Sequence, residues 1–132
     1  MTTKKKNRVL AIDDEPSIIE WLKILLEHQG YEVRTAMIGT RGEEIFKTWK
    51  PDVVITDMML PDIDGLELLR HLKSDPTTAE IPVVVVSADA LASQIEAAMQ
   101  AGAFHYLTKP VSVAELLSVV DSVLEGAETR FG

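Results

Sequence analysis

Short apolar runs alternate with amphipathic segments along the chain, and this alternation is the feature that most constrains the fold. The runs "RVLAID" (8–13), "DVVITD" (52–57) and "IPVVVVSA" (81–88) are bounded by acids or turn-forming residues. Such runs are typical of strands that a sheet buries on both faces. "YEVRTA" (31–36) alternates, which predicts a strand near the edge of the sheet, and "AFHYLTK" (103–109) predicts a fifth strand.

Apolar residues at helical spacing follow each of these runs. In "IIEWLKILLEHQG" they fall at positions 18, 19, 22, 25 and 26, which defines one helix face. Pro16 suits the first turn of that helix, an acid ahead of it could cap the free N–H groups, and Gly30 suits the end. The other predicted helices cover residues 40–50, 64–75, 91–102 and 113–126.

The resulting order is a strand followed by a helix, five times over. Strands that alternate with helices of this length pair in parallel through right-handed crossovers. We therefore predict an α/β fold: a three-layer, doubly wound (βα)5 architecture of the flavodoxin-like type. Its five-stranded parallel sheet has the expected strand order 2-1-3-4-5.

Length and composition limit the organisation of the chain and the chemistry open to it. The 132 residues suit one domain, expected at 8–126, with a disordered basic tail at 1–7 and a C-terminal tail at 127–132. The sequence has no Cys, which excludes disulfides, cysteine metal sites and thiol chemistry.

Charge and hydropathy narrow the expected partners and location. The net charge of −8 argues against direct nucleic-acid binding, which needs clustered Lys and Arg. No apolar run approaches the roughly 20 residues that span a bilayer. The basic start, "MTTKKKN", is not followed by the apolar stretch of a signal peptide. These features favour a cytoplasmic protein without membrane contact.

The predicted strands end on residues that could share a site. In a doubly wound sheet, ligands bind beyond the carboxyl ends of the strands, near the switch point between strands one and three. Strand one delivers Asp13 and Asp14 to that edge, and strand three delivers Asp57. The last two strands deliver Ser87 and Lys109. Three carboxylates, a hydroxyl and an ammonium should therefore meet.

This set of groups favours phosphoryl chemistry with a divalent cation. Close carboxylates resist ionisation together unless positive charge lies among them, and hard oxygen donors suit Mg²⁺. A cation beside Asp57 could hold a phosphoryl group against it, and an Asp is a competent covalent acceptor. FMN, which the same topology can bind, is disfavoured because three acids in "DDEPS" (13–17) would repel its phosphate.

Simpler interpretations exist for each of these residues. Asp13 and Asp14 could be no more than a helix cap. Ser87 could be an ordinary hydroxyl at a strand end, and Lys109 an ordinary surface lysine. The coincidence of all of them at one predicted edge favours the shared site.

Four segments in order resemble one known family. "AIDDEP", "VVITDMMLPDIDG", "VVVSADA" and "HYLTKP" together are similar to the receiver domain of two-component response regulators, of the chemotaxis-regulator type. The resemblance covers about residues 8–126. Each segment alone is a weak signal, but four with this spacing are a strong one.

The resemblance implies a phosphoacceptor and a metal site. Asp57 matches the aspartate that accepts the phosphoryl group and also binds Mg²⁺, with Mn²⁺ as a possible substitute. Asp14 matches the direct metal ligand, and Asp13 the acid that acts mainly through water. Met59 matches the position whose backbone carbonyl is a metal ligand.

The resemblance also implies residues that sense the phosphoryl group. Ser87 matches the switch hydroxyl, with Ala88 beside it, and Lys109 matches the phosphate-binding lysine. The bond from Lys109 to Pro110 would be cis. Tyr106 matches the aromatic residue whose inward or outward position reports the switch, although an aromatic side chain here could also be plain core packing.

The implied function is phosphorelay signal transduction. A sensor histidine kinase or a phosphotransfer protein would donate the phosphoryl group to Asp57 in a Mg²⁺-dependent reaction, and an output protein or domain that the sequence does not identify would respond. The chain would catalyse only its own phosphorylation and dephosphorylation, and so would not be an enzyme. Met59 and Asp89 match positions expected to tune the lifetime of the phosphoryl group.

Two further expectations follow from particular positions. A Mg²⁺-dependent phosphatase with an aspartyl nucleophile is the alternative function, but such phosphatases typically carry a second acid two residues after the nucleophile, where this chain has Met59. The predicted helices at 91–102 and 113–126 contain no Lys or Arg, which argues against the charge-paired dimers that receivers of DNA-binding regulators often form.

Overall fold

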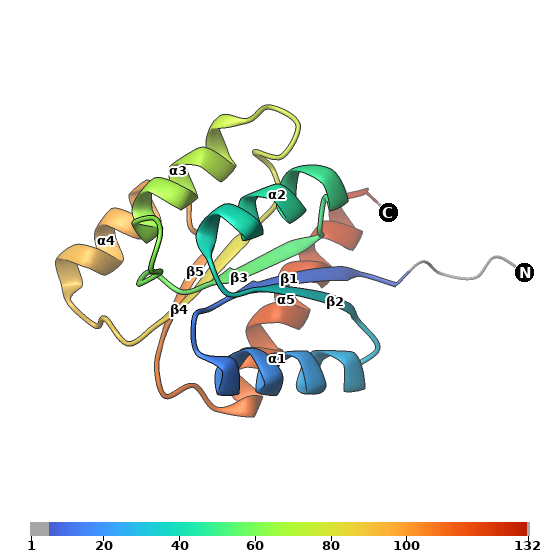
Figure 1. The fold of residues 1–132 in the computed structure, drawn as a ribbon. Helices are drawn as coiled ribbons and strands as arrows, with labels where there is room; N and C mark the ends of the chain where they lie inside the picture. Colours follow the sequence, from blue (N-terminus) through green and yellow to red (C-terminus); the bar gives the residue numbers. More distant parts are fainter. Residues whose placement is uncertain (1–5, 132) are drawn as a thin grey trace, which may run out of the picture.

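The computed structural model describes residues 6–131, with side chains as far as residue 125. Strands and helices alternate strictly along the chain (Figure 1). The strands are β1 (Arg8–Ile12), β2 (Glu32–Ala36), β3 (Val53–Thr56), β4 (Val83–Ser87) and β5 (His105–Thr108). The helices are α1 (Pro16–His28), α2 (Gly39–Trp49), α3 (Gly65–Ser74), α4 (Ala92–Gln100) and α5 (Val113–Phe131).

The five strands form one parallel sheet in the order β2-β1-β3-β4-β5, which confirms the predicted flavodoxin-like topology. Because β1 lies between β2 and β3, the chain reverses direction across the sheet at the β1–β3 boundary. Crossover loops leave in opposite directions there, and the carboxyl ends of β1 and β3 open onto a shared edge. Asp13 and Asp57, which directly follow these two strands, lie at this edge.

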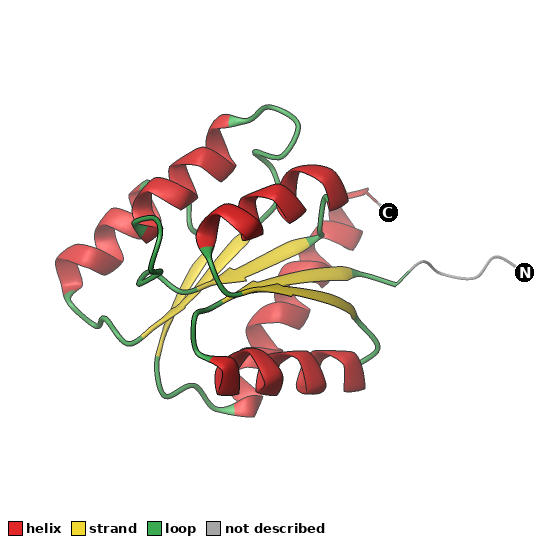
Figure 2. Ribbon diagram, in the orientation of Figure 1, coloured by secondary structure: helices red, strands yellow, loops and turns green. Residues whose placement is uncertain are grey.

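Two helical layers cover the sheet, as Figure 2 shows. Alternate residues of each central strand point to opposite faces. On one face Leu10 and Ile12 of β1 pack with side chains of α2, α3 and α4, while on the other Val9 and Ala11 pack with α1 and α5. All four of these β1 side chains are buried, so the position at which the strand ends is fixed from both sides.

The helix boundaries differ from the prediction mainly at the C-terminus. Helix α5 continues to Phe131 rather than ending at Gly126. A glycine inside a helix costs only about 1 kcal/mol relative to alanine, and the residues that follow it here include the good helix formers Ala127 and Glu128. Residues 1–5 of the predicted basic tail and residue 132 of the predicted C-terminal tail lie outside the described residues. None of the described helices is long and apolar enough to cross a membrane.

Candidate functional site

Three residues from three strands meet at the carboxyl edge. Each follows directly after its strand: Asp13 after β1, Asp57 after β3 and Lys109 after β5. The Lys109 Nζ lies 2.9 Å from Asp13 Oδ2 and 2.9 Å from Asp57 Oδ2. Backbone hydrogen bonds continue the sheet up to these residues, since the Asp57 N–H donates to the Ile12 carbonyl and the Lys109 N–H to the Ser87 carbonyl.

The charges of Asp13, Asp57 and Lys109 stabilise one another, and the three side chains are largely buried. Burial raises the pKa of Asp13, although hydrogen bonds from the Glu15 N–H and from Lys109 oppose that rise. Burial also disfavours the charged form of Lys109, but its hydrogen bonds to Asp13 and Asp57 outweigh this cost and raise the Lys109 pKa. The ammonium is therefore charged at neutral pH, and it lies between two buried carboxylates.

The third acid completes an oxygen cluster. Asp13, Asp14 and Asp57 each offer a carboxylate oxygen within 4.8 Å of the others. Asp14 is exposed, and among the described residues it has no hydrogen-bond or ion-pair partner. Three carboxylates outnumber the one ammonium of Lys109, and hard oxygen donors are the ligands that Mg²⁺ and Mn²⁺ take. The residues present therefore fit a divalent cation.

The loop between β3 and α3 brings backbone groups to the same place. The Met59 N–H donates to Asp57 Oδ1 at 3.1 Å, while the Met59 side chain is exposed. The loop closes on itself, because Met59 and Asp64 form an isolated antiparallel bridge and the Gly65 N–H donates to the Met58 carbonyl at 3.1 Å. The Met59 main chain is therefore fixed by its hydrogen bond to Asp57 and by its bridge to Asp64.

The end of β4 supplies a second set of groups. Ser87 is fully buried, and its Oγ accepts a hydrogen bond from the Asp89 N–H at 3.3 Å. The Tyr106 hydroxyl donates to the Asp89 carbonyl at 2.6 Å. Burial raises the pKa of Tyr106, with a further contribution from the charges of Asp89 and Asp57, while a hydrogen bond with Ser87 opposes the rise. Ala88 is exposed beside Ser87, and the Lys109–Pro110 peptide bond is cis.

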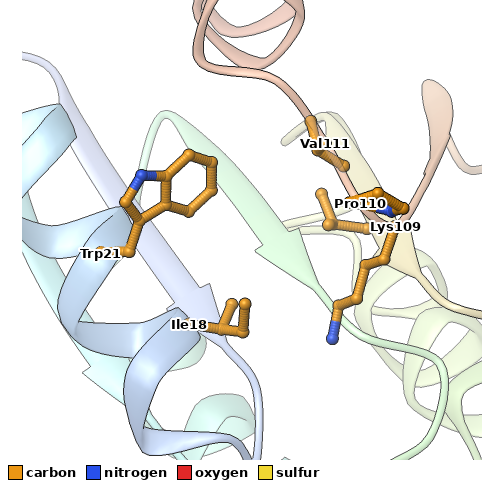
Figure 3. A pocket seen from close by; sticks show the side chains of 6 residues that line it. Ile18, Trp21, Lys109, Pro110 and Val111 are labelled. Carbon is orange, nitrogen blue, oxygen red and sulfur yellow. The ribbon is translucent and has the colours of Figure 1, made fainter.

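An apolar cavity adjoins the acidic cluster. It has a volume of about 410 Å³ and is lined by Ile18, Trp21, Val86, Lys109, Pro110 and Val111. Figure 3 shows the α1 residues on one side and the β5–α5 loop on the other, with the Lys109 side chain reaching along the edge between them. The aliphatic stem of Lys109 therefore contributes to the apolar wall, while its Nζ binds the two acids.

Two contacts at this edge were not predicted. The expected acid cap of α1 is wrong: Glu15 is the N-cap residue and makes no side-chain cap hydrogen bond, while its carboxylate lies 3.5 Å from Lys109 Nζ. Asp62 accepts hydrogen bonds from the N–H groups of Gly39 and Thr40. The sequence offers no signal for this second contact, because the partners lie in the preceding βα unit.

The chain matches the family model described as the response regulator receiver domain over residues 9–121. Protein PilH of Pseudomonas aeruginosa is 35% identical over 119 residues, which is 90% of this chain and 98% of PilH. The DNA-binding dual master transcriptional regulator RpaA of Synechocystis is 39% identical over 120 residues, 89% of this chain but 48% of RpaA. The chain thus spans about half the length of RpaA.

A solved structure with the same fold extends this comparison. The chemotaxis response regulator CheY4 of Vibrio cholerae superposes with a TM-score of 0.86 at 27% identity, and the match covers 91% of this chain and all of CheY4. The sheet order, the residues that end its strands and the family match agree with one another. The chain belongs to the receiver domains of response regulators, the signalling domains of two-component systems.

Proposed function

We propose that this receiver domain accepts a phosphoryl group on Asp57. The observation that carries the proposal is the position of the Lys109 ammonium, 2.9 Å from both Asp57 and Asp13. A carboxylate held against a fixed cation has little freedom to turn away, and the same cation can contact an oxygen of an arriving phosphoryl group. Asp57 is the acceptor and Lys109 the phosphate-binding residue.

The donor is a phosphohistidine on a sensor histidine kinase or a phosphotransfer protein. A carboxylate oxygen of Asp57 forms a bond to phosphorus, and the bond from phosphorus to the imidazole nitrogen breaks. The electron pair of that bond stays on the imidazole. In the reset step, water attacks phosphorus, the bond to Asp57 breaks, and inorganic phosphate leaves. The chain performs these steps on itself only.

The reaction requires Mg²⁺, for which Mn²⁺ can substitute. The carboxylates of Asp13, Asp14 and Asp57 and the backbone carbonyl of Met59 would hold the cation. When bound, it neutralises charge on the phosphoryl oxygens. Asp13 has a second task, because it shares Lys109 with Asp57 and so keeps the ammonium beside the acceptor.

The response to phosphorylation begins at the end of β4. Ser87 and Ala88 bind the new phosphoryl oxygens, so that the Ser87 hydroxyl exchanges its contact with the Asp89 N–H for one with the phosphate. The Tyr106 side chain then moves as well, because its hydroxyl donates a hydrogen bond to the carbonyl of Asp89, the residue whose N–H contacts Ser87. The phosphoryl group thereby biases a two-state element. Met59 and Asp89, which flank the site, set how long the phosphoryl group lasts.

The downstream partner is a protein rather than nucleic acid. The net charge of −8 opposes direct binding to a phosphate backbone. In a relative such as RpaA, which is named as DNA-binding, the matched region is only about half of the protein. We therefore assign the chain to cytoplasmic phosphorelay signalling, with its output carried by a separate protein or domain.

Labelling with acetyl phosphate tests the proposal. With Mg²⁺, the chain should take up phosphate stoichiometrically, and the label should be lost in Asp57→Ala and when Mg²⁺ is removed with a chelator. Asp75→Ala is the control, because it removes a carboxylate beyond the end of α3 whose hydrogen bonds, among the described residues, come from Thr77 alone. Labelling that survives in Asp57→Ala, or sustained multiple turnover of phosphate esters, would contradict the proposal.

A further inference from the structure

Asp62 ties the β3–α3 loop to the start of α2. Its Oδ1 accepts a hydrogen bond from the Gly39 N–H at 2.7 Å, and its Oδ2 accepts one from the Thr40 N–H at 2.8 Å. Both oxygens of one carboxylate are therefore used on two consecutive backbone donors of a different βα unit. The side chain remains exposed, so this contact is not a product of core burial.

Within the part of the chain that the structure describes, no other side chain caps this end of α2. Its N-cap residue is Ile38, whose side chain cannot accept a hydrogen bond, and the first N–H groups of a helix have no partner within the helix. A carboxylate at that position also interacts favourably with the helix dipole. The desolvation of Asp62 is outweighed by the N–H groups of Thr40 and Gly39, which lower the Asp62 pKa. Asp62 thus serves α2 as a cap supplied from the loop.

The packing beneath the carboxylate is equally close. Gly39 is buried, and a Cβ added to it would lie 2.1 Å from Ile63 Cγ2 and 3.3 Å from Leu60 Cδ1. Only a residue without a side chain lets the first turn of α2 approach the loop this closely. The loop therefore contacts α2 through apolar side chains as well as through the hydrogen bonds of Asp62.

The contacts of the loop with α2 also restrict the position of Met59. Between Met58 and Gly65 it is closed by a backbone hydrogen bond and by the bridge from Met59 to Asp64. A short closed loop cannot shift at residue 62 without shifting at residue 59. The Met59 main chain also donates to Asp57 Oδ1, which places it against the phosphoacceptor.

We propose that Asp62 is a positioning residue that holds the Met59 carbonyl in place for the divalent cation, so that the first turn of α2 supports the metal site. The inference rests on the proposed function, in which that carbonyl is a metal ligand. Asp62 itself does not touch the cation or the phosphoryl group. Its effect passes through the loop, and it should therefore change the affinity for Mg²⁺ separately from the stability of the fold.

Asp64 offers a matched control in the same loop. It is also an exposed aspartate, and its Oδ1 also caps a helix, by accepting from the Leu66 N–H at 2.8 Å. Asp62→Ala and Asp64→Ala each remove one negative charge and one helix cap. Only Asp62→Ala removes the hydrogen bonds between the loop and α2.

Mg²⁺ titrations followed by the backbone amide resonances of the full chain, together with urea unfolding, test the inference. We expect both variants to lose similar stability. Asp62→Ala should bind Mg²⁺ about tenfold more weakly, which is the low end of the loss seen when a residue that orients a metal ligand is removed. Asp64→Ala should bind Mg²⁺ as the unaltered chain does. Asp62→Asn keeps one acceptor oxygen and should recover part of the affinity, and it also serves if Asp62→Ala does not fold.

The amides of Gly39 and Thr40 should exchange faster with solvent in Asp62→Ala than in Asp64→Ala. Equal Mg²⁺ affinities in the two alanine variants, with the unaltered chain still binding Mg²⁺ and still labelled at Asp57, would overturn the inference and leave the proposed function standing. An unaltered chain that binds no Mg²⁺ would overturn both.

Discussion

At the scale of a single residue, the pKa of Tyr106 depends on groups of the proposed site, and its measurement therefore tests how those groups are arranged. Its hydroxyl donates to the Asp89 carbonyl, and its ring is partly buried beside Ser87. Ionisation would place a negative charge in a desolvated position near the carboxylates of Asp89 and Asp57. Each of these effects favours the neutral phenol, so the Tyr106 pKa lies above the ordinary tyrosine value.

The ultraviolet absorbance of tyrosinate measures this pKa directly. The chain has two tyrosines, so Tyr31→Phe leaves Tyr106 as the only phenol that titrates. We expect its midpoint above the ordinary value of about 10, and we expect Asp89→Asn to bring the midpoint down by removing a nearby negative charge. Since the unfolded phenol ionises first, stability should fall as the pH rises through about 10.

Glu96→Gln is the matched control for this titration, because it neutralises an exposed acid of α4, whereas the charges that raise the Tyr106 pKa are those of Asp89 and Asp57. A Tyr106 midpoint at the ordinary value, or one that Asp89→Asn and Glu96→Gln change equally, would contradict the environment described for Tyr106.

At the scale of elements, the local sequence pattern was enough to predict where a residue lies whenever its position depends only on its own strand. The meeting of Asp13, Asp57 and Lys109 could be predicted because each directly follows a predicted strand, and the parallel topology then brings the ends of β1, β3 and β5 together. The β2 edge position was likewise evident from its alternation. The sheet order followed from the alternation of strands and helices together with the number of strands and the size of the chain.

Contacts between elements were not predictable in the same way. The Asp62 carboxylate meets α2 because Leu60 and Ile63 pack on Gly39, and that packing depends on the path of the loop in three dimensions. The prediction that an acid caps α1 was wrong for a related reason. The Asp13 carboxylate is held by Lys109 and by the Glu15 N–H, so it is not available to the first N–H groups of α1.

Two glycines test how closely the elements approach one another. A Cβ on Gly65, the first residue of α3, would lie 2.5 Å from the Met58 Cα and 2.6 Å from the Met58 carbonyl oxygen, so Gly65→Ala forces backbone to move. A Cβ on Gly42, in α2, would lie 2.4 Å from Ile12 Cδ1 and 2.8 Å from Ile12 Cγ1, which belong to a side chain rather than to the backbone. We expect Gly65→Ala to lower the free energy of unfolding by about 3 kcal/mol, near the upper end for overpacking, and Gly42→Ala by about 1 kcal/mol.

Urea unfolding of the two variants measures the difference. Gly30→Ala is a useful third variant, because nothing lies within 4 Å of its added Cβ and its φ of +93° isolates the cost of backbone strain. If Gly42→Ala were the more damaging of the close-packed pair, the tighter contact would be between α2 and β1 rather than within the β3–α3 loop.

At the scale of the whole molecule, the distribution of charge limits how copies can associate. Neither α4 nor the part of α5 before Arg130 contains a Lys or Arg, while both helices carry acids. The neighbouring surface also exposes apolar side chains, among them Leu91 and Phe104. Two copies that met through this surface would bring acid against acid, which is unfavourable at low ionic strength.

We therefore expect no charge-paired dimer through α4, β5 and α5 when the chain is activated. Sedimentation velocity with beryllofluoride and Mg²⁺, at low and at high salt, measures this. The activated chain should sediment as a monomer at low salt, where repulsion between net charges of −8 is least screened. Added salt screens that repulsion and can only strengthen association through the apolar side chains, so a dimer that dissociates as salt rises would contradict the prediction. Leu91→Ser separates the two contributions: it removes an exposed apolar side chain at constant charge, and it should weaken any association that salt promotes.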